Sequence, residues 1–553
     1  RKMKNLMIMA VILASVANQS CQRKEIADFI VKNSVVYSVD TNFRIAESFA
    51  VKDGKFLAVG TNQDIEKSYY SDKVYDLEGK PVYPGFYDAH CHFAGYAGNL
   101  RKADLAGTSS FSEICDRLVE NQKSNPSTWV QGRGWDQNDW PVKKFPDRSD
   151  LDKIFPEKPV YLTRIDGHAA VVNTTSLKLA GVDQNTVIKG GEIIKEGGRV
   201  TGVLVDNAMY LVARLIPEMV ELEEADALLQ AQKNCFGVGL TTVADAGLGM
   251  GTVKLMDRLQ KEGLLKMRVY AMLAPTQENF KEFISKGIYK TDRLNVRSVK
   301  LFADGALGSR GALMLEPYAD APEKSGLQVN ETGYLKDICQ KCYDAGYQVE
   351  THCIGDSANR LMLTIYKDIL KTKNDRRWRI EHAQIIHPDD FQIFGEYNII
   401  PSVQTSHATS DMYWAGDRVG PVRIKGAYAY KQLMEQNGWI PNGSDFPVEG
   451  INPLFGFFAG FARMDQSGFP AGGWMMENAL SREECLKAMT IWAAKSCFEE
   501  NERGSIEPGK MADFVVLEED IMKAEPLKVP KTKVLETWIG GERAFATAEI
   551  HKP

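Results

Sequence analysis

Four of the eight histidines in the sequence lie where they could bind a metal ion. His90 and His92 are separated by a single residue, at the end of the stretch from Pro84 to His92. Because residues i and i+2 of a strand point to the same face, these two imidazoles could hold one ion side by side. His352 and His382 each end an apolar, strand-like run, where a parallel barrel places its active-site residues. The four histidines therefore predict a metal centre.

Two further residues fit the same chemistry. Asp445 follows an apolar segment at a glycine-rich turn and could ligate an ion or carry a proton from water to a leaving amine. The alternative for Asp445 is that it caps the N-terminus of a helix. Lys300 interrupts the apolar run from Val299 to Phe302, and buried lysines are rare unless they are paired or used in chemistry.

Four residues outside this set are candidates for contacting a substrate. We assign a catalytic role to His168, and substrate binding to His407, because either imidazole could donate to a carbonyl oxygen and its developing negative charge. Both could equally be loop histidines with satisfied hydrogen bonds. Arg310 could hold a carboxylate or form a surface ion pair. Trp135 could line an apolar pocket or belong to a local core.

The elements that must position these residues alternate between short apolar runs and helical patterns over residues 84–496. Such alternation predicts βαβ units around a parallel sheet. Both a barrel and an open doubly wound sheet fit the rhythm, but no phosphate-binding G-x-G-x-x-G follows the first strand. Residues from about 100 to 229 are interpreted as an insertion over the barrel mouth. The candidate strands are Leu240–Ala244, Ser298–Ala303, Gln348–His352, Trp378–His382, Ile399–Gln404 and Trp439–Gly443.

The two ends of the chain are rich in short strands. Residues 47–59 predict a hairpin that turns at Asp53-Gly54, and residues 535–546 predict another around Gly540-Gly541. Further β-rich stretches are residues 28–39 and 512–517. We therefore expect one small, discontinuous β-domain built from residues 22–83 and 497–553.

The order of the candidate ligands resembles the metal-dependent amidohydrolase superfamily. Its pattern is H-x-H after the first barrel strand, lysine on the fourth, histidines after the fifth and sixth, and aspartate after the eighth. The closest resemblance is to amidohydrolase family 3, the branch that contains N-substituted formamide deformylases. It extends over nearly the whole chain after residue 21 and is carried by residues 132–136, 166–168, 300–310, 352–356 and 504–513.

This resemblance implies a (β/α)8 barrel of the TIM type, a small β-sandwich domain and two divalent metal ions. His90, His92 and Asp445 would hold one ion, His352 and His382 the other, and Lys300 would bridge both as a carbamate. Imidazole and carboxylate ligands suit zinc, with iron, manganese and nickel as alternatives.

The implied activity is hydrolysis of a carbon–nitrogen bond in a small amide or formamide by a metal-activated water. Three alternatives stay open: a deaminase on the same barrel, a lactone or ester hydrolase on that barrel, and a non-catalytic, surface-tethered binding protein. Lys300 argues against the deaminases, because that group usually works with one metal and lacks this ligand.

The composition and the first residues indicate partners and location. A net charge of −6 without basic runs argues against nucleic-acid binding. The basic start and the apolar run 6–17 predict a secretory signal over residues 1–21, and hence a periplasmic or cell-envelope protein. Cys21 is a candidate lipid anchor, with cleavage after Ala17 as the alternative. The expected partner is a small amide; a membrane would be contacted only through the lipid, and a homo-oligomer is compatible with the sequence.

The nine cysteines lack the regular spacing of a disulfide framework. Cys339 and Cys342 form a lone C-x-x-C within the helix-like stretch Leu335 to Ala345. We interpret this pair as structural, with a metal or redox role as the alternative.

Overall fold

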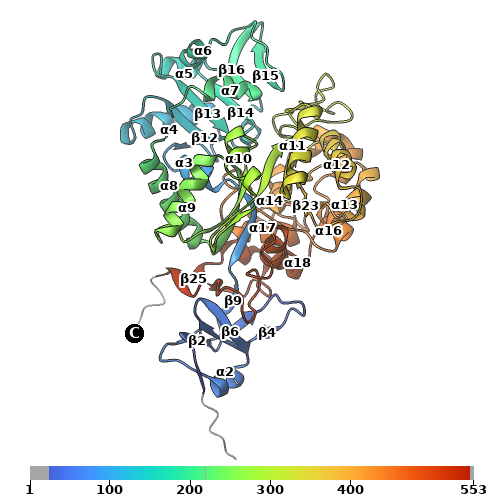
Figure 1. The fold of residues 1–553 in the computed structure, drawn as a ribbon. Coiled ribbons are helices and arrows are strands. Elements are labelled where there is room, and N and C mark those ends of the chain that lie inside the picture. Colours follow the sequence, from blue (N-terminus) through green and yellow to red (C-terminus); the bar gives the residue numbers. More distant parts are fainter. Residues whose placement is uncertain (1–23, 218, 548–553) are drawn as a thin grey trace, which may run out of the picture.

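A computed structural model describes residues 24–217 and 219–547 of the chain. The expected signal segment and Cys21 lie outside these residues, so export and lipid anchoring stay predictions. Within the described ranges, no helix has both the length and the apolar character needed to cross a bilayer. Figure 1 shows strands from both chain ends at the bottom, a barrel in the middle and a further sheet at the top.

Seven parallel strands form most of the barrel, which confirms the predicted fold class. In spatial order they are β10 (Phe86–Cys91), β17 (Leu240–Leu248), β18 (Arg268–Leu273), β20 (Leu294–Phe302), β21 (Gln348–Cys353), β22 (Arg379–His382) and β23 (Ile400–Ser402). The short β19 (Tyr289–Lys290) pairs antiparallel with β20. Parallel strands need crossover connections, and the helices that follow the strands supply them.

The helices around the barrel bury apolar faces against its strands. They include α3 (Phe93–Asn99), α8 (Glu221–Gly237), α9 (Met250–Lys261), α10 (Gln277–Glu282), α11 (Thr332–Ala345), α12 (Asp356–Leu370), α13 (Phe391–Tyr397), α14 (Thr405–Asp411), α15 (Ala415–Arg423), α16 (Tyr430–Asn437), α17 (Pro453–Ala462), α18 (Arg482–Ala488) and α19 (Ile491–Ser496). Cys339 and Cys342 lie buried on α11 as free thiols in the barrel core, which agrees with their structural interpretation.

The eighth barrel position differs from the prediction. Residues 439–443 form no regular strand, but the chain there still runs between the two edges of the sheet. Val403 after β23 donates a backbone hydrogen bond to this segment at 3.1 Å and accepts one at 2.9 Å. On the other side, Asp445 N donates to His90 O at 2.8 Å. An irregular segment therefore closes the barrel and carries Asp445 beside β10.

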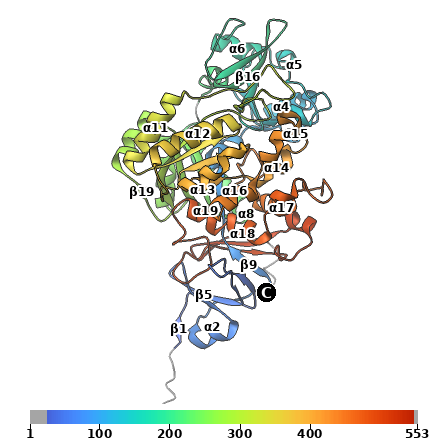
Figure 2. The ribbon, with the colours of Figure 1, turned by 90° about the vertical axis from the view of Figure 1, so that its right-hand side faces the viewer.

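A six-stranded sheet lies over one end of the barrel, as Figures 1 and 2 show from two sides. Leu105, Trp135 and Leu162 belong to its own apolar core. The insertion is shorter than expected, because α8 already packs Ala225 and Leu228 into the barrel core. The sheet order is β11 (Ala103–Asp104), β12 (Val130–Trp135), β13 (Val160–Arg164), β14 (Ala169–Val172), β16 (Arg199–Asp206) and β15 (Gly191–Glu196), with helices α4 (Phe111–Ser124), α5 (Ser149–Ile154), α6 (Thr174–Ala180) and α7 (Asn207–Ala213).

Strands from both chain ends form two further sheets, whose apolar faces meet in one core. The rings of Phe29 and Trp538, one from each sheet, lie 4.9 Å apart. The expected hairpin turn has Asp53 at φ 52° and Gly54 at φ 73°, the backbone that a type I′ turn requires. The first sheet has the order β6 (Lys55–Gly60), β5 (Ser48–Lys52), β2 (Phe29–Lys32) and β8 (Val74–Asp76). The second has the order β26 (Glu542–Ala546), β25 (Val534–Ile539), β24 (Phe514–Leu517), β9 (Pro81–Pro84), β3 (Val35–Tyr37) and β4 (Ile45–Ala46).

Candidate metal centre

A cavity of about 300 Å³ opens at the C-terminal ends of the barrel strands, beneath the insertion. This is the end of a parallel barrel where active sites are built. Most of the residues that the sequence indicated lie around it: His92, His168, Lys300, His352, His382, His407 and Asp445.

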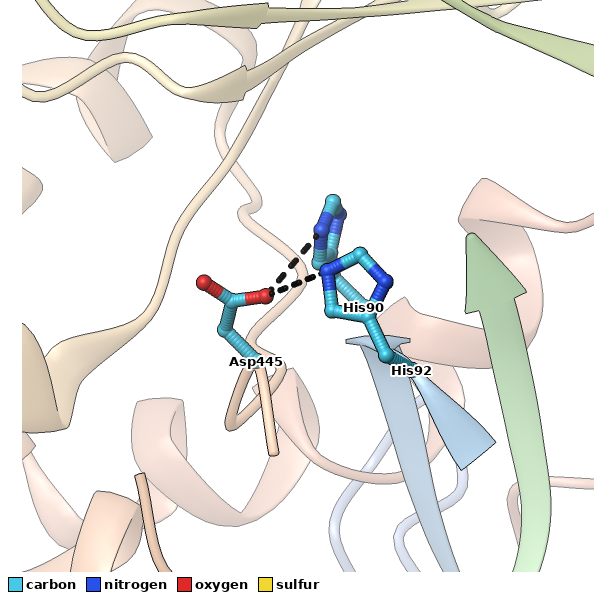
Figure 3. A group of neighbouring side chains, drawn as sticks. All are labelled: His90, His92 and Asp445. Carbon is cyan, nitrogen blue, oxygen red and sulfur yellow. Dashed lines mark ion pairs between the residues drawn. The ribbon is translucent and has the colours of Figure 1, made fainter. Parts of the chain in front are cut away.

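His90, His92 and Asp445 point toward one another (Figure 3), and His92 and Asp445 line this cavity. Asp445 Oδ1 lies 3.1 Å from His92 Nε2 and 3.5 Å from His90 Nε2. That oxygen is buried, and no donor of the described residues forms a hydrogen bond with it. Because a buried carboxylate oxygen without a partner is costly, a cation between these three side chains is the fitting occupant.

Lys300 and two more histidines lie directly beside this group. Lys300 is only 1% exposed, and its Nζ lies 3.3 Å from His90 Nε2. The ring of His382 lies 5.0 Å from that of His90 and 4.6 Å from that of His352. The six predicted ligands are therefore neighbours in space. A second group of mutually close ligand atoms joins His382, His407 and Asp445.

Burial sets the protonation of these groups in the way that metal binding needs. It lowers the pKa of His90 to about 4, with the charge of Lys300 acting in the same direction. Burial also holds the pKa of His352 and of His382 well below the usual range. Burial alone would raise the pKa of Asp445, but the nearby side chains of His407 and His92 keep it well below its usual value. These shifts favour neutral imidazoles at His90, His352 and His382 and an ionised carboxylate at Asp445, the forms that ligate metals.

Two of the candidate ligands have a backbone that side chains rarely adopt. His382 has φ 73° and Asp445 has φ 60°, both in the left-handed region. Such a conformation costs a non-glycine residue on the order of 1–2 kcal/mol. It persists only where the surroundings enforce it, and such positions cluster at active sites.

The ring nitrogens that face away from the centre are also held. His90 Nδ1 contacts Glu381, and His382 Nδ1 lies 2.6 Å from Gln404 Oε1. A partner of this kind fixes the orientation and tautomer of a ligating histidine. Sequence reasoning missed both partners. The one available signal was Glu381, a charged residue within an apolar strand.

His168 and His407 both line the cavity, but they face different groups. His407 Nε2 lies 3.4 Å from Asp445 Oδ2, and its Nδ1 lies 2.9 Å from Glu449. His168 Nδ1 lies 2.7 Å from Asp206, another partner that the sequence did not reveal. Among the described residues, no hydrogen bond involves His168 Nε2, so this atom is open to a substrate.

Trp135 and Arg310 do not line the cavity, which corrects their assignment to substrate binding. Trp135 is fully buried in the insertion core, where its Nε1 donates to Leu162 O at 2.8 Å. Arg310 is held by Asp320 at 2.8 Å outside the cavity. Both correspond to the alternatives that the sequence left open.

Arg164 is the arginine that reaches the cavity, and the sequence did not single it out. It is 1% exposed and donates to Asp166 at 2.5 Å and to Gln137 at 2.8 Å. It also forms an ion pair with Asp136. Through these three contacts, Arg164 fixes the loops that follow β12 and β13 at the wall of the cavity.

The model of the amidohydrolase family matches residues 73–545. The chain belongs to this family. Among its relatives, protein LONG AFTER FAR-RED 3 of Arabidopsis thaliana is 33% identical, over 94% of this chain and 92% of its own length. YtcJ of Bacillus subtilis (strain 168), named as an amidohydrolase, is 30% identical over 90% of this chain and 96% of its own length.

Two further similarities agree with the family assignment. The N-substituted formamide deformylase of Arthrobacter pascens is 25% identical over 94% of this chain and 98% of its own length. The crystal structure of an uncharacterized metal-dependent hydrolase from Pyrococcus horikoshii OT3 is 27% identical, with a TM-score of 0.73, over 90% of this chain and 99% of that one. The protein is thus a metal-dependent hydrolase, and the predicted family, fold and enzyme class are confirmed.

Proposed function

We propose that this amidohydrolase cleaves the carbon–nitrogen bond of a small amide, formamide or N-acylated amine. The observation that carries the proposal is the buried, unpartnered Oδ1 of Asp445 between His90 and His92. The similarity to an N-substituted formamide deformylase supports the choice of bond. The cavity of about 300 Å³ fits a small substrate.

We propose that the centre binds two divalent ions, and that these are zinc; the two groups of close ligand atoms, which share Asp445, support a metal centre here. His90, His92 and Asp445 would hold the first ion, and His352 and His382 the second. Lys300 would bridge both as a carbamate. Its position 3.3 Å from His90 supports this role, as does burial, which lowers the pKa of the amine and favours the neutral form that adds carbon dioxide. Bound ions would supply polarisation of the carbonyl and activation of water.

The side chains of the chain itself would move the protons. Asp445 takes a proton from the attacking water and passes it to the nitrogen as the carbon–nitrogen bond breaks. The products are a carboxylic acid and an amine, so the atoms of the water are fully used. His168 donates from Nε2 to the carbonyl oxygen as negative charge develops there, and it does so as an imidazolium, because the Asp206 carboxylate accepts the proton of Nδ1. Burial would lower the pKa of His168, but the bond to Asp206 raises it above its usual value. His407, beside Asp445 Oδ2, orients the carboxylate.

Metal analysis and a substrate series test this proposal. We expect two transition-metal ions per chain, and hydrolysis of N-formyl and N-acyl amines that is lost on chelation and restored by zinc. Matched esters, lactones and cyclic amidines of the same carbon skeleton are compared under the same conditions. Selective turnover of the cyclic amidines, lactones or esters would replace the proposed bond, and a folded protein without metal would contradict the enzyme mechanism itself.

A further inference from the structure

Asp206 lies at the joint between the insertion and the barrel and combines several unfavourable features. It ends β16 and has φ 49° and ψ −123°, a backbone conformation that is sparsely populated for any residue with a side chain. It occupies the N-cap position of α7, where aspartate ordinarily accepts a hydrogen bond from the helix backbone. Here the carboxylate makes no such bond. The local helix therefore gains nothing from this side chain.

The carboxylate of Asp206 is directed instead at His168. Its Oδ1 lies 2.7 Å from His168 Nδ1, and the backbone N of Asp206 donates to His168 O at 2.9 Å. The Asp206 side chain is 2% exposed, and its Oδ2 has no hydrogen-bond partner among the described residues. A buried carboxylate with one unpaired oxygen costs free energy, so its single bond to the histidine is the feature that accounts for it.

Two glycines of the barrel loop after β20 make room for this carboxylate. A Cβ at Gly305 would lie 2.4 Å from Asp206 Oδ2, and a Cβ at Gly311 would lie 2.6 Å from the same atom. The loop also approaches the metal centre, since His352 Nε2 lies 3.3 Å from Gly305 O. The slot between the glycines thus fixes Asp206 relative to the barrel rather than to the insertion alone.

We infer that Asp206 is a positioning residue, which acts through His168 to hold Nε2 of that imidazole toward the reacting carbonyl. Because Nδ1 is bonded to Asp206, Nε2 on the other side of the ring is presented to the cavity. The ring lies 4.8 Å from that of His352, beside the proposed second ion. This inference rests on the proposed function for the part that His168 plays in turnover, whereas the orientation of the ring is independent of it.

Asp206→Gly tests the inference, since glycine adopts this backbone without strain and only the carboxylate is lost. The expected result is unchanged metal content and melting temperature, with kcat reduced on the order of tenfold to a hundredfold and KM nearly unchanged. Gly311→Ala should lower kcat in the same way without changing Asp206 itself, because the added methyl group displaces the Asp206 carboxylate. Asp53→Gly is the matched control, as Asp53 also has a positive φ but lies in the terminal hairpin turn.

A double variant separates positioning from a merely structural role. If Asp206 acts through His168, then His168→Gln/Asp206→Gly is no slower than His168→Gln alone. Additive losses, or loss of metal together with kcat, overturn the inference. Crystal structures of the zinc-loaded wild type and Asp206→Gly supply a readout that needs no substrate. The His168 ring is expected to leave its orientation in the variant, and an unmoved ring overturns the inference even if no amide is hydrolysed.

Discussion

The candidate ligands are held from two sides, and this determines what each substitution removes. Each imidazole that faces the centre has a second contact behind it, as between His382 and Gln404. The Asp445 carboxylate has His407 beside its Oδ2, whereas the Lys300 amine contacts His90. Neither side chain stands behind another candidate ligand, so a change at either residue should alter metal binding or turnover without collapsing a neighbouring ligand.

Lys300→Ala is predicted to lose bound metal and activity together. Without the proposed bridging oxygen, an ion at His352 and His382 would keep only those two imidazoles, so we expect metal content to fall below two ions and activity to fall about a hundredfold. Short carboxylic acids should partly restore both, because they can occupy the space of the lost side chain. Metal analysis and turnover with and without propionate measure this, and a variant with full metal content would exclude the bridging role.

Asp445→Asn is predicted to separate binding from turnover. The amide keeps one ligating oxygen close to His90 and His92, so most metal should remain, but it cannot take a proton from water. We expect kcat to fall about 10²- to 10⁴-fold. Glu331→Gln, in an exposed ion pair with Lys189, is the matched control and should behave like the wild type. An Asp445→Asn enzyme with normal kcat would exclude the proposed proton transfer.

What could be predicted at this scale follows from residue type and local position. His352 and His382 end apolar runs, and that alone placed them at a strand end facing the centre. The partners behind the ligating imidazoles could not be predicted: Glu381 contacts His90, which lies 291 positions away in the chain. Arg310 and Trp135 were misplaced for the same reason, since the face that a side chain presents depends on tertiary packing.

Among the elements, the irregular segment before Asp445 is the closest to the chemistry. This segment replaces the expected eighth strand. The sequence pattern could not reveal the difference, because an apolar run looks the same whether or not it forms a complete ladder of strand hydrogen bonds. Its contact with β10 is very close. A Cβ at Gly443 would lie 2.4 Å from His90 N and 2.6 Å from His90 O. Only glycine lets the segment approach the strand that carries the first ligand.

Gly443→Ala is therefore predicted to weaken metal binding. Its methyl group must push the segment away from His90, at a cost of about 1–3 kcal/mol, and this moves Asp445 relative to His90 and His92. Gly251→Ala in α9 is the control, because nothing lies within 4 Å of the added methyl group. It should leave metal affinity unchanged and stabilise the helix slightly. Competition with a chromogenic chelator compares the two, and equal zinc affinity would contradict the prediction.

At the scale of the whole molecule, a buried ion pair links the terminal strands to the barrel. Arg268 begins β18, and its Nε and Nη2 donate to the two oxygens of Asp513 at 2.8 and 3.0 Å. Both side chains are almost fully buried. Asp513 precedes β24 and also accepts from Gly540 N at 2.6 Å. The sequence predicted both sets of strands, but nothing in it indicated this link between residues 245 positions apart.

Arg268→Met is predicted to destabilise the protein by about 3–5 kcal/mol at neutral pH, because it leaves a buried carboxylate without its partner. Lys266→Met removes an exposed pair with Glu542, which joins the same two parts, and should cost less than about 1 kcal/mol. Thermal and urea unfolding of both variants measure the difference. Equal stability of the two variants would mean that the buried pair does not hold the parts together.

The pH dependence provides a second test of the same pair. Burial would raise the pKa of Asp513, but the charge of Arg268 and its hydrogen bonds lower it below the usual 3.8. A carboxylate whose pKa is lowered by folding stabilises the protein above its unfolded pKa, and this contribution is lost as the pH falls through the folded pKa. The difference between wild type and Arg268→Met should thus be full at neutral pH and shrink as the pH falls, first through the raised pKa of the unpaired Asp513 in the variant and then through the lowered pKa of Asp513 in the wild type. A difference that stays constant down to about pH 2 would show that lost packing of the long arginine side chain, rather than its charge, links the terminal strands to the barrel.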